Sequence, residues 1–436
     1  MRKTIILLTS LLSVLTAGAQ RVMTLKECIE MALERNINIK QYANQEAQQK
    51  LVLSDARHSR LPDLNASATQ SFNFGRGLNS ENNYVNRNTM NTGFALSTSM
   101  QLLTGGRIAA ETAAGRLNLQ AAAADLERTR QSLALQVTAA YLQAVYAAEM
   151  VKVQDEQVSL SKVLCESKSK MLSAGKVPES ELIEAQSQLT QDEMARTQAR
   201  CDQKLALLDL SQLLEMRSPD SIGVTAPLDS VPSILPPLPD VIYAKAEGIK
   251  PEIAAERLRL QADEKNIRAA RAALYPTLSL GAGLSSSYYK TSGFKASSFT
   301  KQLSDNFDKN IGLQLSIPIF NRFTTRNAIS RARLQRDAQA LKLDDTRKAL
   351  YKEIQQAYYN ALNAQAKYNS ALAARTAAET NFKMMTGKYE NGKANQTELA
   401  EAKTKRAKAI TSCLQAKYEY ILRMKIIRFY EGQDIS

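Results

Sequence analysis

The sequence has very few of the residues on which most catalytic and metal sites depend. Among 436 residues there is one histidine, His58, and there are four cysteines without C-x-x-C or zinc-binding spacing: Cys28, Cys165, Cys201 and Cys413. A single histidine excludes metal sites built from several histidines, and nothing in the sequence looks like a catalytic site. Cys165 continues a seven-residue series of apolar positions, so we expect a buried, unreactive thiol in a helix seam. The composition therefore predicts no enzyme, no metal site and no cofactor.

Long apolar runs are absent after the first twenty residues. The opening "MRKTIILLTSLLSVLTAGAQ" has Arg2 and Lys3, a short apolar run and an Ala17-Gly18-Ala19 site, which together predict a signal peptide over residues 1–19. The run is too short to span a bilayer. We expect the mature chain to begin at Gln20. Because the cleavage site is not followed directly by a cysteine, we expect no lipid anchor.

The net charge of +14 raises the question of nucleic acid binding. However, the lysines and arginines alternate with Glu, Asp and Gln along helical stretches, and the densest basic cluster, residues 403–408, is short. This pattern is typical of solvated helix faces, so we expect no nucleic acid partner.

The chain contains an internal duplication. Corresponding segments are offset by 214 residues in the first pair and by 217 in the others: "ARHSRLPDL" with "ARAALYPTL", "VTAAYLQA" with "IQQAYYNA", and "LSAGKVPESELIEAQ" with "YENGKANQTELAEAK". A single insertion or deletion accounts for the difference in offset. We assign one repeat to residues 20–216 and the other to residues 239–436. A proline-rich, extended linker over residues 217–238 joins them.

Each repeat has the same order of elements: a helix, two strands, a long helix and a returning helix. Residues 24–60 predict a helix that Pro62 ends. The strands should lie at about 63–104 and about 277–320, where apolar residues alternate with small or polar ones. Polar stretches between the paired strands, residues 75–91 and 285–309, suit exposed loops.

Two proline-free stretches, at about 106–173 and about 322–390, predict helices of roughly 100 Å each. Seven-residue spacing along them predicts close packing of helix against helix. Each helix breaks at a glycine and returns, so each repeat ends in a helical hairpin. The two tips comprise Gly175, Lys176 and Val177, and Gly392, Lys393 and Ala394.

The alternating strands suit a membrane β-barrel, although a soluble β-sandwich shows the same alternation. The signal peptide, the polar composition and the long loops favour the barrel. The face toward lipid would comprise Leu64, Phe72, Phe94, Leu96, Leu280, Leu313 and Ile317, with Ser67 and Ser99 pointing inward. Four strands are too few to close a barrel, so several chains must share one, and the strand count alone allows a dimer or a trimer. The helices begin opposite the long loops and would therefore project into the periplasm.

This duplicated layout resembles the TolC-type outer-membrane efflux protein family, the outer-membrane factors. The resemblance covers nearly all of the mature chain and is strongest in "YENGKANQTELAEA" and "LSAGKVPESELIEA". It implies a mainly α-helical fold with membrane β-strands, in which a homotrimer forms a twelve-stranded barrel continued by a twelve-helix periplasmic tunnel. It also implies a passive exit channel of a tripartite efflux or type I secretion system in the outer membrane of a Gram-negative bacterium. The implied partners are a periplasmic adaptor (membrane fusion protein), an inner-membrane pump of the RND, ABC or MFS type, and outer-membrane lipid.

The resemblance further assigns roles to individual residues. The two tips would contact the adaptor. A lumenal constriction would be formed by Glu398 and Glu401, with Glu181 and Glu184 as the weaker candidates in the first hairpin. Each assignment also has a structural alternative. A glycine at a tip can simply end a helix, and Asn395 with Glu398 matches a capping box.

Two other classes of function stay open on the sequence. A periplasmic coiled-coil adaptor or scaffold accounts for the long helices but not for four alternating strands. A surface adhesin or enzyme on a barrel accounts for the strands but leaves the paired helices without a role.

Overall fold

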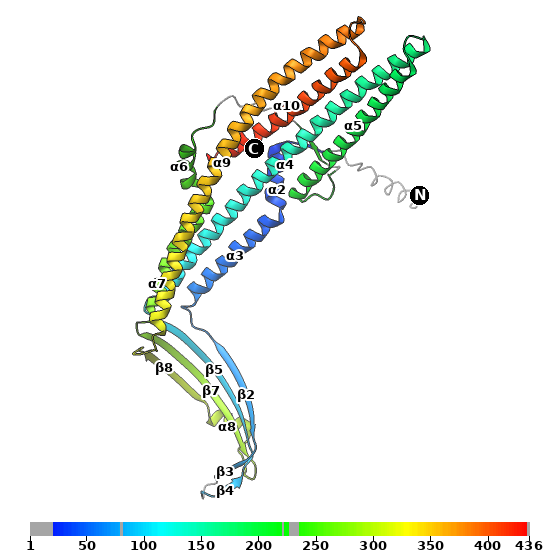
Figure 1. Ribbon diagram of the computed structural model, residues 1–436. Coiled ribbons are helices and arrows are strands. Elements are labelled where there is room, and N and C mark those ends of the chain that lie inside the picture. The colour runs from blue at the N-terminus through cyan, green and yellow to red at the C-terminus, as the bar shows by residue number, and fades with distance from the viewer. Residues whose placement is uncertain (1–20, 79–81, 220–221, 226–234, 434–436) are drawn as a thin grey trace, which may run out of the picture. The chain divides into compact units, whose positions relative to one another are not determined.

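Figure 1 shows a computed structural model of the chain, which describes residues 21–78, 82–219, 222–225 and 235–433. The predicted signal peptide and the predicted start at Gln20 lie outside the described residues. The chain divides into two compact units. Unit 1 comprises Met1–Asn44, Ala124–Ala254 and Asp345–Ser436, and unit 2 comprises Gln45–Ala123 and Ala255–Asp344. Both repeats therefore contribute to each unit.

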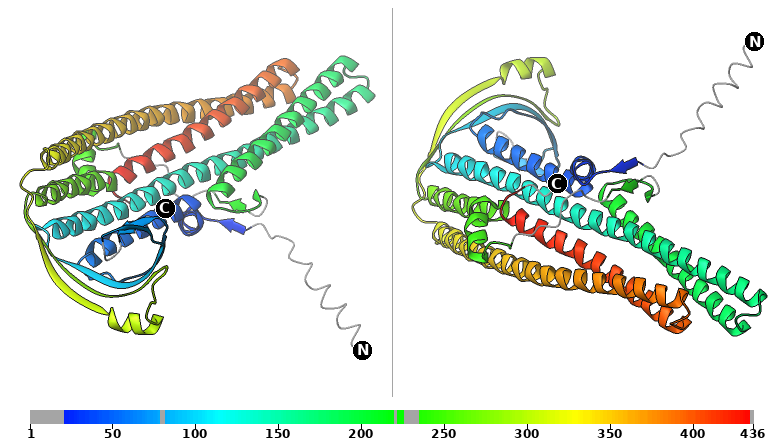
Figure 2. Two further views of the ribbon diagram at one scale, coloured as in Figure 1. Left: turned by 90° about the horizontal axis from the view of Figure 1, so that it is seen from below. Right: turned by 90° about the horizontal axis from the view of Figure 1, so that it is seen from above.

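The helices have matching lengths in the two repeats. The long helices α4 (Arg107–Ser173) and α9 (Thr324–Glu390) have 67 residues each, and the returning helices α5 (Glu179–Leu213) and α10 (Gln396–Tyr430) have 35 each. Figures 1 and 2 show α5 running back along α4, and α10 along α9. The predicted long helices and hairpins are thus confirmed. In the described part of the chain, no helix combines the length and apolar character needed to cross a membrane.

The prediction of one helix over residues 24–60 is wrong, because the chain forms α2 (Leu25–Arg35) and α3 (Ile37–His58). Asn36 interrupts them with an extended backbone, ψ 133°. Its side chain accepts a hydrogen bond from the N–H of Asn38 (2.9 Å) and donates one to the carbonyl of Leu213 (3.3 Å). The second repeat breaks at the corresponding Lys250, between α6 (Pro239–Ile249) and α7 (Pro251–Ala272). There the following proline disfavours helical backbone at the residue before it.

Unit 2 holds a four-stranded antiparallel sheet in the order β2-β5-β7-β8. The central strands β5 (Thr89–Leu103) and β7 (Thr277–Thr291) have 15 residues each. The edge strands β2 (Asn65–Asn73) and β8 (Asp308–Ser316) have nine. The central pair therefore joins the two repeats.

The stretches predicted to be loops contain secondary structure of their own. Residues 75–91 include the paired strands β3 (Arg76–Leu78) and β4 (Tyr84–Asn86) as well as the start of β5. Residues 285–309 include the end of β7 and the short helix α8 (Phe299–Asp305). The predicted loops were too long, since β7 continues to Thr291 and β5 starts at Thr89, because Ser, Thr and Asn also occupy paired positions there.

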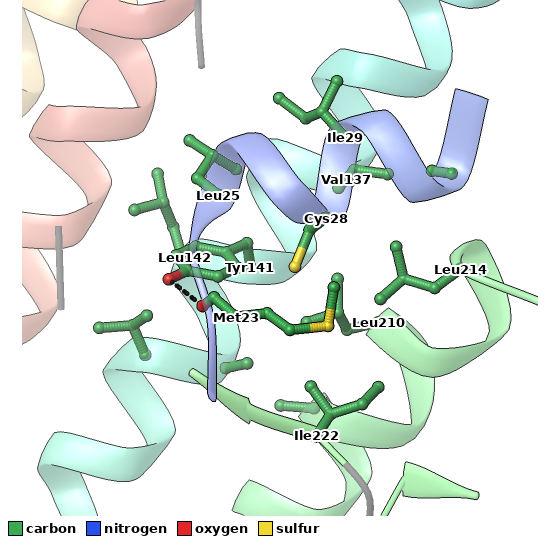
Figure 3. Close-up of a cluster of buried hydrophobic side chains, with 14 of the residues drawn as sticks. Met23, Leu25, Cys28, Ile29, Val137, Tyr141, Leu142, Leu210, Leu214 and Ile222 are labelled. Carbon is green, nitrogen blue, oxygen red and sulfur yellow. Dashed lines mark hydrogen bonds between the residues drawn. The ribbon is translucent and has the colours of Figure 1, made fainter. Parts of the chain in front are cut away.

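Unit 1 contains a small parallel sheet beside its helices. β1 (Arg21–Met23) pairs with β6 (Ile222–Val224), so a segment of the predicted linker is part of the folded unit rather than a mere connection. Figure 3 shows the core around these strands. It joins β1, α2, α4, the end of α5 and β6 through buried side chains: Met23, Leu25, Cys28, Ile29, Val137, Tyr141, Leu142, Leu210, Leu214 and Ile222.

The cysteines are free, and their burial differs from the prediction. Cys165 is only half-buried, whereas Cys28 and Cys413 are the buried ones. Burial and the neighbouring Glu27 raise the pKa of Cys28 to about 12, which makes this thiol unreactive near neutral pH. Among the described residues, no group of three or more His, Cys, Asp or Glu side chains is placed to hold a metal ion.

Tyr141 ties the small sheet to the long helix. Its hydroxyl lies 3.0 Å from the carbonyl oxygen of Met23, the hydrogen bond drawn in Figure 3, and 2.8 Å from that of Thr225. We predict that Tyr141→Phe lowers the free energy of unfolding by about 1–3 kcal/mol, because a buried acceptor loses its donor. Tyr359→Phe, at an exposed site, is the control and should change stability little. Equal effects in chemical denaturation would show that the Tyr141 hydroxyl contributes nothing specific.

Candidate functional site

The sheet register brings the predicted lipid-facing residues in the strands to a single face. Residues paired across strands share a face of a sheet, and alternate residues along a strand do so as well. Leu96 pairs with Ala66 and Leu284, and Leu280 pairs with Met100 and Leu313. The residues that share this apolar face are Phe72, Phe94, Leu96, Leu280 and Leu313. Leu64 and Ile317 flank the edge strands and are exposed.

The opposite face is polar and has small side chains. It comprises Ser67, Thr69, Asn91, Gly93, Ser97, Ser99, Ser279, Gly281, Gly283, Asn310 and Gly312. Both predicted inward serines lie on this face, and Ser99 donates from its N–H (2.5 Å) and its hydroxyl (3.0 Å) to Asp63. A sheet with one polar and one apolar face can separate water from lipid.

Aromatic residues mark both ends of the apolar face. Phe320 and Phe323 are exposed near the helices, with ring centres 5.6 Å apart. At the loop end Phe299 of α8 contacts Phe94 (6.4 Å) and Tyr288 (5.3 Å). From Leu278 to Tyr288 the strand extends about 33 Å, or about 25 Å in height at a barrel tilt of about 40°. An apolar band of this height between aromatic rings matches outer-membrane strands.

The hairpin tips have the same backbone geometry. Gly175 (φ 64°) and Gly392 (φ 70°) lie in the left-handed region. In each tip the glycine N–H and the next N–H bond back to the helix end, as in a Schellman motif, for example Lys176 to Met171 at 2.9 Å. A Cβ would meet no atom within 4 Å at either position, so the backbone conformation alone selects glycine. The tip residues Lys176 and Lys393 are exposed.

The helices that follow the tips begin differently. α5 has Pro178 as its N-cap and no side-chain cap, whereas α10 begins with a capping box. The carboxylate of Glu398 accepts from the N–H of Asn395 at 2.9 Å, and the Asn395 side chain accepts from the N–H of Glu398 at 2.9 Å. Glu398 therefore caps helix α10, which is the structural alternative to a role in the constriction. Glu401 lies 3.6 Å from Lys405 and is exposed, as is Glu184.

Lys168 connects the first hairpin to the second. Its ammonium forms an ion pair with Glu181 of α5 and lies 5.4 Å from the ring centre of Tyr389 on α9. Burial alone would lower the pKa of Lys168, but Glu181 and Tyr389 outweigh burial and the pKa is raised. The lysine thus stays charged. The predicted constriction residue Glu181 is already paired.

A second polar contact joins α4, α5 and α10. Lys403 donates to Asp192 at 2.6 Å and to the buried Ser161, and the Ser161 hydroxyl donates to Asp192. Gln188 donates to the other Asp192 oxygen at 3.0 Å. Each polar group therefore has a partner, as partial burial of an ion pair requires.

Arg406 forms a third contact between the hairpins. It binds Glu156 at 2.8 Å and lies 5.3 Å from the ring centre of Phe382. The prediction that residues 403–408 form a solvated face is therefore wrong for Lys403 and Arg406. In the first repeat their counterparts are Gln186 and Leu189, a difference between copies that could have revealed the contacts.

Comparisons with known proteins bear on these features. The family model described as "Outer membrane efflux protein" matches residues 28–215 and 242–427. The chain is 25% identical to protein CyaE of Bordetella pertussis over 320 residues, covering 72% of this chain and 65% of CyaE. It is 23% identical over 306 residues to the alkaline protease secretion protein AprF of Pseudomonas aeruginosa, covering 69% of this chain and 62% of AprF. The matched part is thus less than two thirds of either relative.

Solved structures share the fold. The crystal structure of the CmeC outer membrane channel of Campylobacter jejuni is similar with a TM-score of 0.77 at 19% identity, covering 94% of this chain and 87% of CmeC. The likeness extends over both repeats and so includes the sheet and the hairpins.

The Lys403–Asp192 contact predicts strong coupling between the hairpins. In a double-mutant cycle with Lys403→Ala and Asp192→Ala, we expect a coupling energy of about 1–3 kcal/mol, because both side chains are mostly buried. The control cycle uses Lys405→Ala and Glu401→Ala, a pair 71% and 65% exposed, and should give less than about 0.5 kcal/mol. Equal coupling in both cycles, measured by chemical denaturation, would rule out a special role for the first pair.

Proposed function

Because the chain belongs to the outer membrane efflux protein family, we propose that three copies form a passive exit channel in the outer membrane of a Gram-negative bacterium. The observation that carries this proposal is the four-stranded sheet, with one polar and one apolar face and with edge strands β2 and β8. Three chains supply twelve strands, a number that closes a barrel. Its polar faces line water and its apolar faces contact lipid, through Leu64, Phe72, Phe94, Leu96, Leu280, Leu313 and Ile317.

The helical hairpins give the channel its periplasmic part. In the proposed trimer, α4, α5, α9 and α10 of each chain form a tunnel toward an adaptor and an inner-membrane pump of a tripartite efflux or type I secretion system. The tips at residues 175–177 and 392–394 support adaptor contact, because they present matching turns and exposed lysines at the ends of both hairpins. The name of AprF, a secretion protein, supports the secretion role.

The proposed constriction lies just behind the tips. Threefold symmetry would gather the carboxylates of Glu398 and Glu401, with Glu181 and Glu184 behind them, around one axis. The contacts favour Glu401 over Glu398 as the gate residue, since Glu398 already serves the helix cap. A ring of carboxylates attracts cations.

A lipid-facing apolar surface predicts face-dependent tolerance to charge. Leu96→Arg should destabilise the assembled channel by about 2–4 kcal/mol, because it adds a cation to the apolar face of the sheet, within the band between the aromatic residues. Ser67→Arg, adjacent in the sheet but on the polar face, is the matched control and should be tolerated. The yield of heat-modifiable oligomer in the membrane fraction measures both. Equal loss in the two variants would indicate a soluble sheet.

The constriction predicts separate effects for the two glutamates. Glu401→Ala should weaken cation selectivity and block by divalent cations in single-channel recordings from planar bilayers. Glu398→Ala should mainly lower stability, by about 1 kcal/mol, through loss of the cap. Glu264→Ala, on α7, is the control. Unchanged selectivity in the Glu401 and Glu398 variants would contradict the gate.

Adaptor contact predicts crosslinks from the tips. In a Cys201→Ser background, which removes the exposed native thiol, Lys176→Cys and Lys393→Cys should each crosslink to a membrane fusion protein in cells. Lys204→Cys on α5 controls for an exposed helix site remote from the tip. Capture of the adaptor by the control alone, or only of unrelated proteins by the tips, would refute the contact.

A further inference from the structure

We infer that four lysines at the loop end of the sheet bind the phosphate groups of lipid A in the outer leaflet of the membrane. We call them the rim lysines: Lys290, Lys295, Lys301 and Lys309. The inference rests on the proposed function, because it requires the apolar face of the sheet to lie in the membrane.

The register places two rim lysines on the apolar face. Lys290 pairs with Met90, and Met90 in turn pairs with Phe72 of the apolar face. Along β7, Lys290 is the next residue on this face after Tyr288 in the direction of the loops. Lys309 pairs with Leu284, and its ammonium lies 5.3 Å from the ring centre of Phe307. A lysine near the edge of an apolar band lays its stem along apolar surface and extends its charge to the headgroups.

Helix α8 fixes a third lysine at the same end. Pairing of β7 with β8 stops at Ser285, and beyond it α8 side chains take over the free edge of β7. Gln302 bonds to both the N–H (2.9 Å) and the carbonyl (3.0 Å) of Tyr289, and Asn306 donates to Ser287 at 2.7 Å. These residues and Phe299 define the side of α8 toward the sheet, so Lys301 lies on the opposite side. Lys295 belongs to the connection that leads into α8.

No ion pair links the rim lysines to a carboxylate in the part of the chain that the structure describes. All four are exposed. The acids near them are Asp305 on α8 and Asp308, which shares the polar face because it pairs with Ser285. Asp305 lies four residues after Lys301 on α8 and can offset part of its charge. Among the described residues, four lysines against these two acids leave this end with a net positive charge.

The height of this charge selects a lipid phosphate as its ligand. The aromatic cluster of Phe94, Tyr288 and Phe299 lies at one end of a band about 25 Å high, and Lys290 lies just beyond it. Lys309 pairs with Leu284 in the row of Leu96, one pair inside Phe94, and its stem extends its charge along the apolar surface toward the headgroups. The loop end faces outward in a barrel of this kind, and lipid A carries its phosphates at that level. Cations near an anionic lipid surface each strengthen binding roughly fivefold.

Native mass spectrometry of the purified trimer with added lipid tests the inference. The wild type should retain diphosphoryl lipid A, and less monophosphoryl lipid A. The variant Lys290→Gln/Lys295→Gln/Lys301→Gln/Lys309→Gln should retain at least about tenfold less. A control with four exposed lysines outside the sheet, Lys40→Gln/Lys50→Gln/Lys204→Gln/Lys348→Gln, should bind like the wild type. If the fourfold rim variant does not assemble, Lys290→Gln/Lys301→Gln should still lower retention by at least about fivefold.

Three results would overturn the inference. These are equal retention by assembled rim and control variants, equal retention of the two lipid A forms, and displacement of lipid A by millimolar inorganic phosphate, which would indicate a site for free phosphate. Conductance of the same preparations separates this test from the proposed function. A wild type that conducts without retaining lipid A contradicts the lipid site alone, whereas one that forms no conducting trimer contradicts the channel.

Discussion

The free backbone edges of the four-stranded sheet constrain how the chain can enter a membrane and assemble. Strands β2 and β8 end the sheet on either side, and each presents a row of N–H and C=O groups outward. In lipid such groups have no water to bind, and leaving each one unpaired costs several kcal/mol. One chain offers no closure. If β2 of one copy pairs with β8 of the next, the N–H and C=O groups of both edge strands form hydrogen bonds. The chain can therefore enter the membrane only as it assembles with other copies.

The same duplication that supplies the strands also supplies two hairpins, and their differences hold them together. At three positions the second repeat has an aromatic or charged residue where the first has leucine or glutamine: Tyr389 against Leu172, Lys403 against Gln186 and Arg406 against Leu189. Each of these second-repeat residues contacts the first hairpin, at Lys168, at Ser161 with Asp192, and at Glu156. The two copies have diverged where they meet. In the proposed tunnel these polar contacts lie toward the tips, where solvent or a partner can compete for them.

The parts of this fold that follow from local patterns were predictable. Alternation with period two identified the strands, and the sheet register then placed Phe94, Leu96 and Leu280 on one face as their spacing requires. Long stretches without proline identified α4 and α9, and glycines identified their ends.

The parts that depend on distant partners were not. The break at Asn36 needs a carbonyl 177 residues away, and the Lys403–Ser161 bond joins positions 242 residues apart. Helix α8 has seven mostly polar residues, and its position comes from the free edge of β7 rather than from its own sequence. For Glu398 the sequence supported two roles at once. The hydrogen bonds show the helix cap, which forms within one chain. A gate would require carboxylates from neighbouring chains, and the sequence of one chain does not describe their placement.

The stoichiometry of the membrane-extracted complex shows whether the sheet edges of separate chains pair with one another. If lipid forces the sheet edges of separate chains together, native mass spectrometry in a mild detergent should give one species with three times the mass of the mature chain. A stable monomer, or a closed dimer, would show that the edges are satisfied in another way and would contradict the account.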